Sequence, residues 1–93
     1  MSIVRLVLYR RPGCHLCDDA ERLLDAEARA LGVMLDLRRV DIDSDPALLA
    51  RFMLEIPVVA LPAGTPELRA PFGAREVRAL LTRIQAAAPA APE

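Results

Sequence analysis

Residues 10–17 read RRPGCHLC and contain both cysteines of this 93-residue chain, Cys14 and Cys17. A run of strand-forming residues, 3–9, precedes this stretch, and a helical pattern follows it. A proline and a glycine break the strand and form the loop between the two elements. Two cysteines separated by two residues in this setting are typical of a dithiol/disulfide redox centre. We therefore expect the rest of the chain to build a scaffold that presents the pair.

Length and composition indicate one soluble globular domain. The chain is 54% hydrophobic and 27% charged, which is not the composition of a disordered segment. We expect the domain to span residues 1–85 and residues 86–93, rich in Ala and Pro, to form a flexible tail. The net charge of -1 leaves no electrostatic footprint for nucleic acid or an anionic membrane.

The same features predict where the protein works. No apolar run approaches the roughly 20 residues of a membrane helix, and residues 1–9 lack the basic leader and cleavage site of a signal peptide. We therefore expect a monomer in the cytoplasm. In that compartment a lone cysteine pair is more often catalytic or metal-binding than a structural crosslink.

A helix is predicted from the cysteine pair to Gly32, which supplies its C-terminal stop. Leu16 and Leu23 are expected to widen its buried stripe, and Asp18 with Arg22 to form an i,i+4 ion pair. The stripe itself follows helical spacing through Cys17, Ala20, Leu24, Ala28 and Leu31.

The remaining sequence predicts an α/β fold in the order β-α-β-α-β-β-α. The expected elements are a half-exposed strand at 35–42, a helix from Asp45 to Met53, a central strand at 56–61, an edge strand at 67–70 and a last helix from about Gly73 to Ile84. The two most apolar strands belong in the middle, which gives a four-stranded mixed sheet of order 2-1-3-4 with helices on both faces. The third and fourth strands, joined by a tight turn, should pair antiparallel.

This order, with Cys-x-x-Cys after the first strand and Ile56-Pro57 before the third, resembles the thioredoxin fold. Residues 9–17 resemble the active-site segment of glutaredoxins, and more narrowly that of small bacterial glutaredoxin-like proteins with a Cys-His-Leu-Cys centre. Residues 40–46 are similar to theirs as well, and the resemblance spans about residues 3–84. It implies that Pro57 is cis and faces the cysteine pair, and that the backbone of Ile56 bridges to the substrate.

The position of each cysteine predicts its role. Cys14, at the mouth of the helix, should be the exposed nucleophile, moderately acidified by the unpaired N–H groups and the helix dipole. Cys17 lies on the buried stripe and should resolve the mixed disulfide. His15 either tunes the thiolate or is a solvated loop residue. A zinc site is disfavoured, because only three candidate ligands lie here and four are needed.

By resemblance, several residues border a glutathione site. Arg11 matches a basic residue that binds a glutathione carboxylate, with a solvated charge as the alternative, and Pro12 adjoins it. Gly73 matches the second glycine of a Gly-Gly pair and Glu76 an acidic residue that follows it. The sequence departs from the pattern with Phe72 in place of the first glycine, and with Glu55 where a threonine is usual, so half of the clamp is present. Arg10 is expected to be simply exposed.

The leading hypothesis is a thiol–disulfide oxidoreductase that reduces protein disulfides or glutathionylated proteins in cell redox homeostasis. No tightly bound cofactor is expected; glutathione or a thioredoxin-reductase-type donor would supply electrons. The alternative is a redox-inactive thioredoxin-fold carrier that holds a metal or iron–sulfur cluster with Cys14 and Cys17.

Overall fold

The computed structural model describes residues 2–87. In chain order its elements are β1 (Ile3–Arg10), α1 (His15–Leu31), β2 (Met34–Asp41), the 3-10 turn η1 (Ile42–Ser44), α2 (Pro46–Phe52), β3 (Val58–Ala60), β4 (Pro66–Arg69) and α3 (Ala74–Ala87). This is the element order that the sequence predicts, with η1 added.

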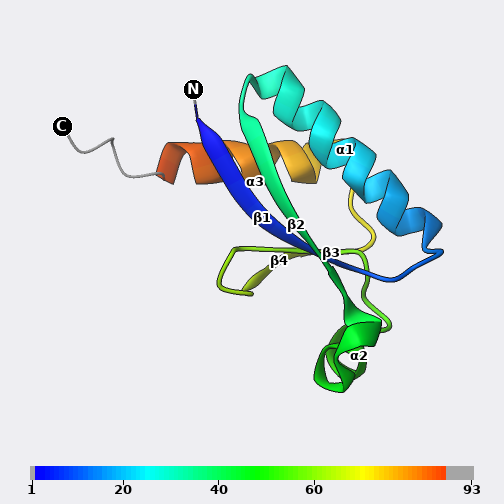
Figure 1. Ribbon diagram of the computed structural model, residues 1–93. Coiled ribbons are helices and arrows are strands. Elements are labelled where there is room, and N and C mark those ends of the chain that lie inside the picture. Colours follow the sequence, from blue (N-terminus) through cyan, green and yellow to red (C-terminus); the bar gives the residue numbers. More distant parts are fainter. Residues whose placement is uncertain (1, 88–93) are drawn as a thin grey trace.

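The sheet has four strands in the order β2-β1-β3-β4, which confirms the predicted topology. β1 and β2 are parallel and joined through α1, whereas β3 runs antiparallel to both β1 and β4. A parallel pair needs a long crossover, and α1 provides it. The Cys-x-x-Cys segment therefore lies at the end of the sheet where β1 leads into α1 (Figure 1).

Side chains of β1 alternate between two apolar clusters, because successive residues of a strand point to opposite faces. Val4, Leu6 and Leu8 pack with α1 and α3 on one face. Val7 and Tyr9 pack with α2 on the other, and the Tyr9 ring stacks on the phenylalanine of α2 with centroids 4.6 Å apart. Helices thus cover both faces of the sheet, as predicted (Figure 1).

Capping residues fix the C-terminal end of α1 and the N-terminal end of α2 where the sequence predicts them. Gly32 adopts a left-handed conformation with φ of 71° and its N–H bonds the last carbonyls of α1, a conformation that glycine accepts without steric cost. Asp45 caps α2 by accepting the Ala47 N–H at 2.9 Å, and Pro46 begins that helix.

The second strand lies one residue earlier than predicted, at Met34–Asp41. It ends at Asp41, because the Asp41 carboxylate accepts the Asp43 N–H at 2.9 Å and the Ser44 hydroxyl donates to the Asp41 carbonyl at 2.6 Å. Together these bonds turn the chain into η1. Ile42, expected in the strand, is instead fully buried in the cluster beneath α2.

The last helix is longer than predicted and continues through Ala87, two residues into the segment expected to be a tail. Residues 88–93, the rest of that segment, lie outside the described residues. Across the part of the chain that is described, no helix combines the length and the apolar character needed to cross a membrane.

Candidate active site

Cys14 and Cys17 are joined by a disulfide, with their Cα atoms 5.2 Å apart. Cys14 is the N-cap of α1 and is half-buried, whereas Cys17 faces the core and is 0% exposed. The burial of Cys17 follows from its place on the apolar stripe of α1. Of the two sulfur atoms, that of Cys14 is the one that a substrate can reach.

The Sγ atom of Cys14 occupies the position that a capping oxygen usually takes. It accepts the backbone N–H of Cys17 at 3.1 Å, as a Ser or Asp side chain does at an N-cap. When the disulfide is reduced, the same N–H and the positive end of the helix dipole favour a thiolate at this point. The geometry therefore separates a half-buried sulfur at the mouth of the helix from a sulfur held in the core.

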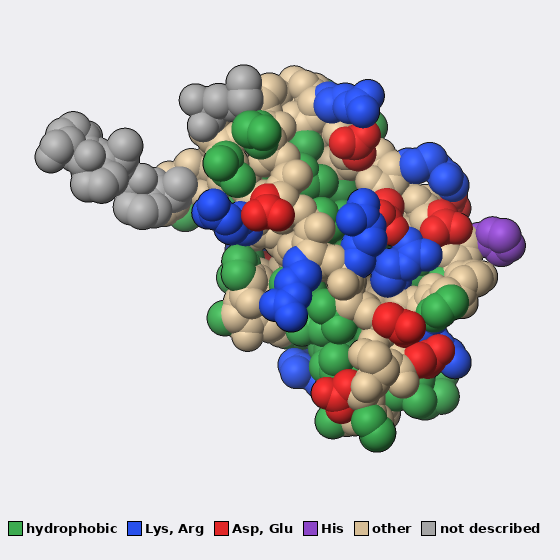
Figure 2. Space-filling view, viewed as in Figure 1, with side chains coloured by type: hydrophobic (Ala, Val, Ile, Leu, Met, Phe, Trp, Pro, Cys, Tyr) green, Lys and Arg blue, Asp and Glu red, His purple; other side chains and the backbone are tan. Residues whose placement is uncertain are grey.

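His15 follows Cys14 as the first residue of α1 and is exposed. Figure 2 shows the imidazole of this single histidine, in purple, projecting from the edge of the molecule. Pro12 is an exposed turn residue between β1 and α1. Both predicted site residues thus lie beside the pair.

The Ile56–Pro57 peptide bond is cis, as the resemblance implies. The carbonyl of Pro57 accepts the Ala70 N–H at 3.1 Å, which ties the segment to the end of β4. The N–H of Ile56 donates to the carbonyl of Phe52 at 3.1 Å. A substrate backbone that used the Ile56 N–H would therefore have to compete with this internal bond.

A mainly apolar groove of about 210 Å³ joins the reactive segment to the cis-proline. Leu16, expected on the buried stripe, is 63% exposed at its edge, because the first turn of α1 projects past the core. The groove is lined by Leu16, Asp19, Ala20, Leu23, Pro57, Ala70, Pro71 and Phe72. It passes directly over residues between and after the two cysteines, and so offers a place for part of a substrate.

Arg11, the predicted anion-binding residue, forms an ion pair with Asp43 of η1 at 2.8 Å. Both side chains are about two-fifths exposed, and such surface pairs contribute little stability. Asp43 nevertheless neutralises the Arg11 guanidinium, the group that the resemblance assigns to binding a glutathione carboxylate.

Glu76 and Gly73, which the resemblance assigns to glutathione binding, are hydrogen-bonded to each other. The Gly73 N–H donates to Oε1 of Glu76 at 2.9 Å, which is the side-chain-to-N-cap half of a capping box. This hydrogen bond to the carboxylate lowers the pKa of Glu76 below its usual range. Glu55, which would place a negative charge near the site, is likewise paired with Arg69 at 2.6 Å.

Arg10 is not simply exposed, so that expectation was wrong. Its side chain is only 16% exposed and bonds Asp18 at 2.7 Å as well as Glu21. The hydrogen bond from Arg10 lowers the pKa of Asp18. Since Asp18 takes Arg10 as its partner, the predicted Asp18–Arg22 pair does not form, and Arg22 pairs with Asp19 instead.

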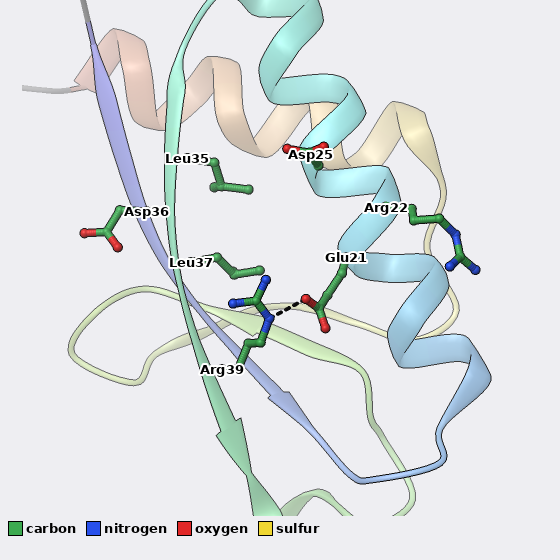
Figure 3. A pocket seen from close by; sticks show the side chains of 7 residues that line it. All are labelled: Glu21, Arg22, Asp25, Leu35, Asp36, Leu37 and Arg39. Atoms are coloured by element: carbon green, nitrogen blue, oxygen red, sulfur yellow. Dashed lines mark hydrogen bonds and ion pairs between the residues drawn. The ribbon is translucent and has the colours of Figure 1, made fainter.

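A second and larger groove lies between α1 and β2 and has a volume of about 560 Å³. Charged side chains dominate its lining, and Glu21 of α1 points toward Arg39 of β2 across it (Figure 3). Neither cysteine lines it. Within residues 2–87, no group of three or more His, Cys, Asp and Glu side chains lies close enough to hold a metal ion.

Sequence reasoning missed the groove and the Arg10 contacts. Phe72 stood out as a departure from glycine, but nothing in the sequence indicated that Pro71 follows a second cis bond, Ala70–Pro71. The helical spacing of Asp18 and Glu21, three residues apart, puts two acids on one face. That spacing was the available signal for a basic partner on a neighbouring strand.

Comparisons with known proteins agree with this geometry. The family profile described as Glutaredoxin-like domain (DUF836) matches residues 5–82. Among solved structures, the target protein XcR50 from X. campestris is 42% identical, with a TM-score of 0.69 over 84% of this chain and 96% of that chain. No match was found among curated proteins.

More distant structures share the fold alone. Thioredoxin-2, a component of the malaria parasite protein secretion machinery, is 20% identical with a TM-score of 0.58, over 87% of this chain and 82% of its own. Another malarial protein is also 20% identical, with a TM-score of 0.57 over 88% of this chain and 97% of its own. These neighbours confirm the thioredoxin-like fold, and the profile match over most of the chain establishes that the protein belongs to the glutaredoxin-like family.

Proposed function

We propose that this protein is a thiol–disulfide oxidoreductase that reduces disulfides on other proteins. The observation that carries the proposal is the unequal placement of the two sulfurs. Cys14 caps α1, half-exposed, with the Cys17 N–H aimed at its sulfur at 3.1 Å, whereas Cys17 is fully buried one turn below. A sulfur that can be attacked from solvent and a sulfur that cannot are what a two-step exchange requires.

The reaction starts from the reduced dithiol. The Cys14 thiolate attacks one sulfur of the substrate disulfide, that S–S bond breaks, and the released substrate thiolate takes up a proton. The Cys17 thiol then loses its proton and its sulfur attacks Cys14, which forms the Cys14–Cys17 disulfide and releases the second substrate thiol. Two electrons and two protons pass to the substrate. An external thiol donor restores the dithiol, so no resident cofactor is needed.

The surroundings of the pair favour a protein substrate over glutathione. Three groups that could hold glutathione are engaged within the chain: Arg11 with Asp43, the Ile56 N–H with Phe52, and Glu76 with Gly73. The groove beside the pair is lined mostly by apolar side chains. A protein substrate can place an apolar side chain that neighbours its disulfide in this groove, and burying that side chain stabilises the complex. Glutathione is a small, charged tripeptide and has little apolar surface to bury.

The cellular part of the proposal follows from the chemistry. A reductase of this kind works where thiol donors keep cysteines reduced, which is the cytoplasm. There it would contribute to redox homeostasis as a monomer that meets its protein substrates transiently. Glutathione and a thioredoxin-reductase-type enzyme are the two candidate donors.

Turnover assays with the full chain test the proposal. We expect wild type to reduce a protein disulfide flanked by a leucine, with electrons from at least one of the two donor systems. Cys14→Ser should be inactive, and Cys17→Ser should accumulate a stable mixed disulfide with the substrate, visible by mass spectrometry. Cys17→Ser is the matched control, because it keeps the nucleophile and removes only the resolving thiol.

The proposed substrate class has its own readout. Wild type should prefer the protein disulfide to a glutathione mixed disulfide in kcat/KM. A preference for the glutathione mixed disulfide would contradict the substrate class and leave the dithiol chemistry intact. Absence of turnover with both donors and both substrates would contradict the oxidoreductase itself.

A further inference from the structure

We infer that Arg10 is a positioning residue for the reactive cysteine: by holding Asp18 and Glu21 it removes their negative charge from the mouth of α1 and keeps Cys14 available as a thiolate. The inference rests on the proposed function, in which Cys14 is the nucleophile. It assigns a role to a residue that touches neither sulfur and lies four positions before the first cysteine.

The contacts of Arg10 connect the three elements that frame the reactive segment. Arg10 ends β1, and its guanidinium bonds Asp18 at 2.7 Å and Glu21, both on α1. Glu21 also bonds Arg39 of β2, the contact that Figure 3 shows across the α1–β2 groove. The side chain of Arg10 is only 16% exposed and that of Glu21 only 19%. Water and salt therefore screen the Arg10–Glu21 pair less than they screen a surface ion pair.

Asp18 lies close to the reactive cysteine. Its backbone N–H donates to the Cys14 carbonyl at 3.1 Å, so the two residues are one helical turn apart. A carboxylate on the helical turn next to a thiolate disfavours the charged form of the sulfur unless a cation compensates it. In the Arg10 network two positive charges, Arg10 and Arg39, balance two negative ones, Asp18 and Glu21, so the group as a whole carries no net charge.

The other charged groups near Cys14 form neutral pairs, so Arg10 is the main determinant of the net charge beside the Cys14 sulfur. Arg11 is paired with Asp43, Asp19 with Arg22, and Glu55 with Arg69, so each of these couples is also neutral as a whole. His15 is exposed, so water screens its electrostatic effect on Cys14. Loss of Arg10 would therefore leave one net negative charge beside the helix mouth, whereas loss of Asp18 would leave one net positive charge.

The experiment is a charge cycle on the reduced full chain, read out as the rate at which iodoacetamide alkylates Cys14 across a pH series. With Arg10→Gln, we expect an alkylation rate about threefold lower at acidic pH and a pH midpoint displaced upward. With Asp18→Asn, we expect the opposite displacement. The double variant Arg10→Gln/Asp18→Asn restores neutrality and should return to the wild-type profile.

A purely structural role for Arg10 predicts a different pattern. Both single variants would then lose rate at every pH, and the double variant would be no better than Arg10→Gln, which would overturn the inference. Arg22→Gln serves as the matched control, because Arg22 also pairs with an acid of the first turns but is 72% exposed; its profile should stay within about 1.5-fold of wild type, since exposed pairs are screened.

Three further outcomes complete the test. If Arg10→Gln does not fold, Asp18→Asn still reports the sign of the field, and a rate that fails to rise contradicts the inference. If wild type has a reversible dithiol couple but the four profiles coincide, the role of Arg10 is wrong and the proposed function stands. If wild type has no such couple, the proposed function fails, and the inference that depends on it fails too.

Discussion

Two parts of the candidate site differ: the Cys14–Cys17 segment, and three polar groups that the resemblance assigns to substrate binding, Arg11, the Ile56 backbone and Glu76. The cysteines are placed by backbone features, an N-cap and a helical stripe. The polar groups are instead oriented by ion-pair or hydrogen-bond partners, and each of the three has such a partner within the chain. A fold can therefore fix the reactive groups of a site while a few neighbouring residues separately set which substrate it binds.

The largest expected effect follows from removing one of the two cysteines. Cys17→Ala removes the proposed resolving thiol from a fully buried position and leaves the three polar groups unchanged. We expect the dithiol turnover rate to fall about a hundredfold or more, because residues that act as a unit lose most of the rate when one is removed. Steady-state reduction of a protein disulfide measures it; a loss of less than tenfold would show that Cys17 does not resolve the intermediate.

The next effect concerns the groove. Phe72→Gly supplies the glycine that the glutaredoxin pattern has at this position and removes an apolar wall of the groove. We expect kcat/KM for a leucine-flanked protein disulfide to fall about tenfold, in line with the loss of one large apolar contact, and that for a glutathione mixed disulfide to rise.

Because Phe72 also packs against the main core cluster, the stability of this variant must be followed by thermal unfolding. Phe72→Leu is the matched control, since it keeps an apolar side chain and should retain most of the protein-disulfide activity. Equal losses on both substrates in Phe72→Gly would indicate damage to the fold and not a change in recognition.

A smaller effect should follow from freeing Arg11. Asp43→Asn removes the carboxylate that pairs with Arg11 at 2.8 Å, and the guanidinium then becomes available to an anionic substrate. We expect kcat/KM for a glutathione mixed disulfide to rise about two- to threefold, the scale of an exposed ion pair. Adding Arg11→Gln should cancel the gain; a gain that persists in the double variant would mean that Arg11 is not its source.

The smallest effect is a pH dependence of stability at Glu76, in the first turn of α3. Accepting the Gly73 N–H lowers the pKa of Glu76 from its ordinary value of 4.5, so this cap stabilises the folded state above that pH. Its contribution is lost as the pH falls through the lowered folded pKa. The difference in Tm between wild type and Glu76→Gln should therefore be largest near neutral pH and vanish in acid; a constant difference would contradict the role of the charge.

Much of the fold was predictable because its signals are local. The apolar runs of β1 and β3, the periodic stripe of α1, and the caps Gly32 and Asp45 each depend on residues that are close in sequence. The end of β2 was misplaced because the hydrogen bonds of Asp41 turn the chain before Ile42, where the apolar alternation itself continues.

The site divides in the same way. The depth of Cys17 follows from helical spacing, whereas the partners of Arg10 and Arg11 lie on other elements and depend on how the strands and helices pack. Leu16 shows the limit of periodicity, since a residue on the apolar side of the first turn has no core beneath it and becomes part of the groove. The sequence pattern therefore identifies the reactive cysteines better than it identifies the residues that would bind a substrate.

The most direct test of the proposed chemistry is an anaerobic titration of the purified full chain against dithiol redox buffers, with the Cys14–Cys17 disulfide followed by mass spectrometry. We expect one reversible two-electron couple that disappears in Cys14→Ser. A stoichiometrically bound metal or a cluster chromophore in place of such a couple would contradict the oxidoreductase and favour a carrier.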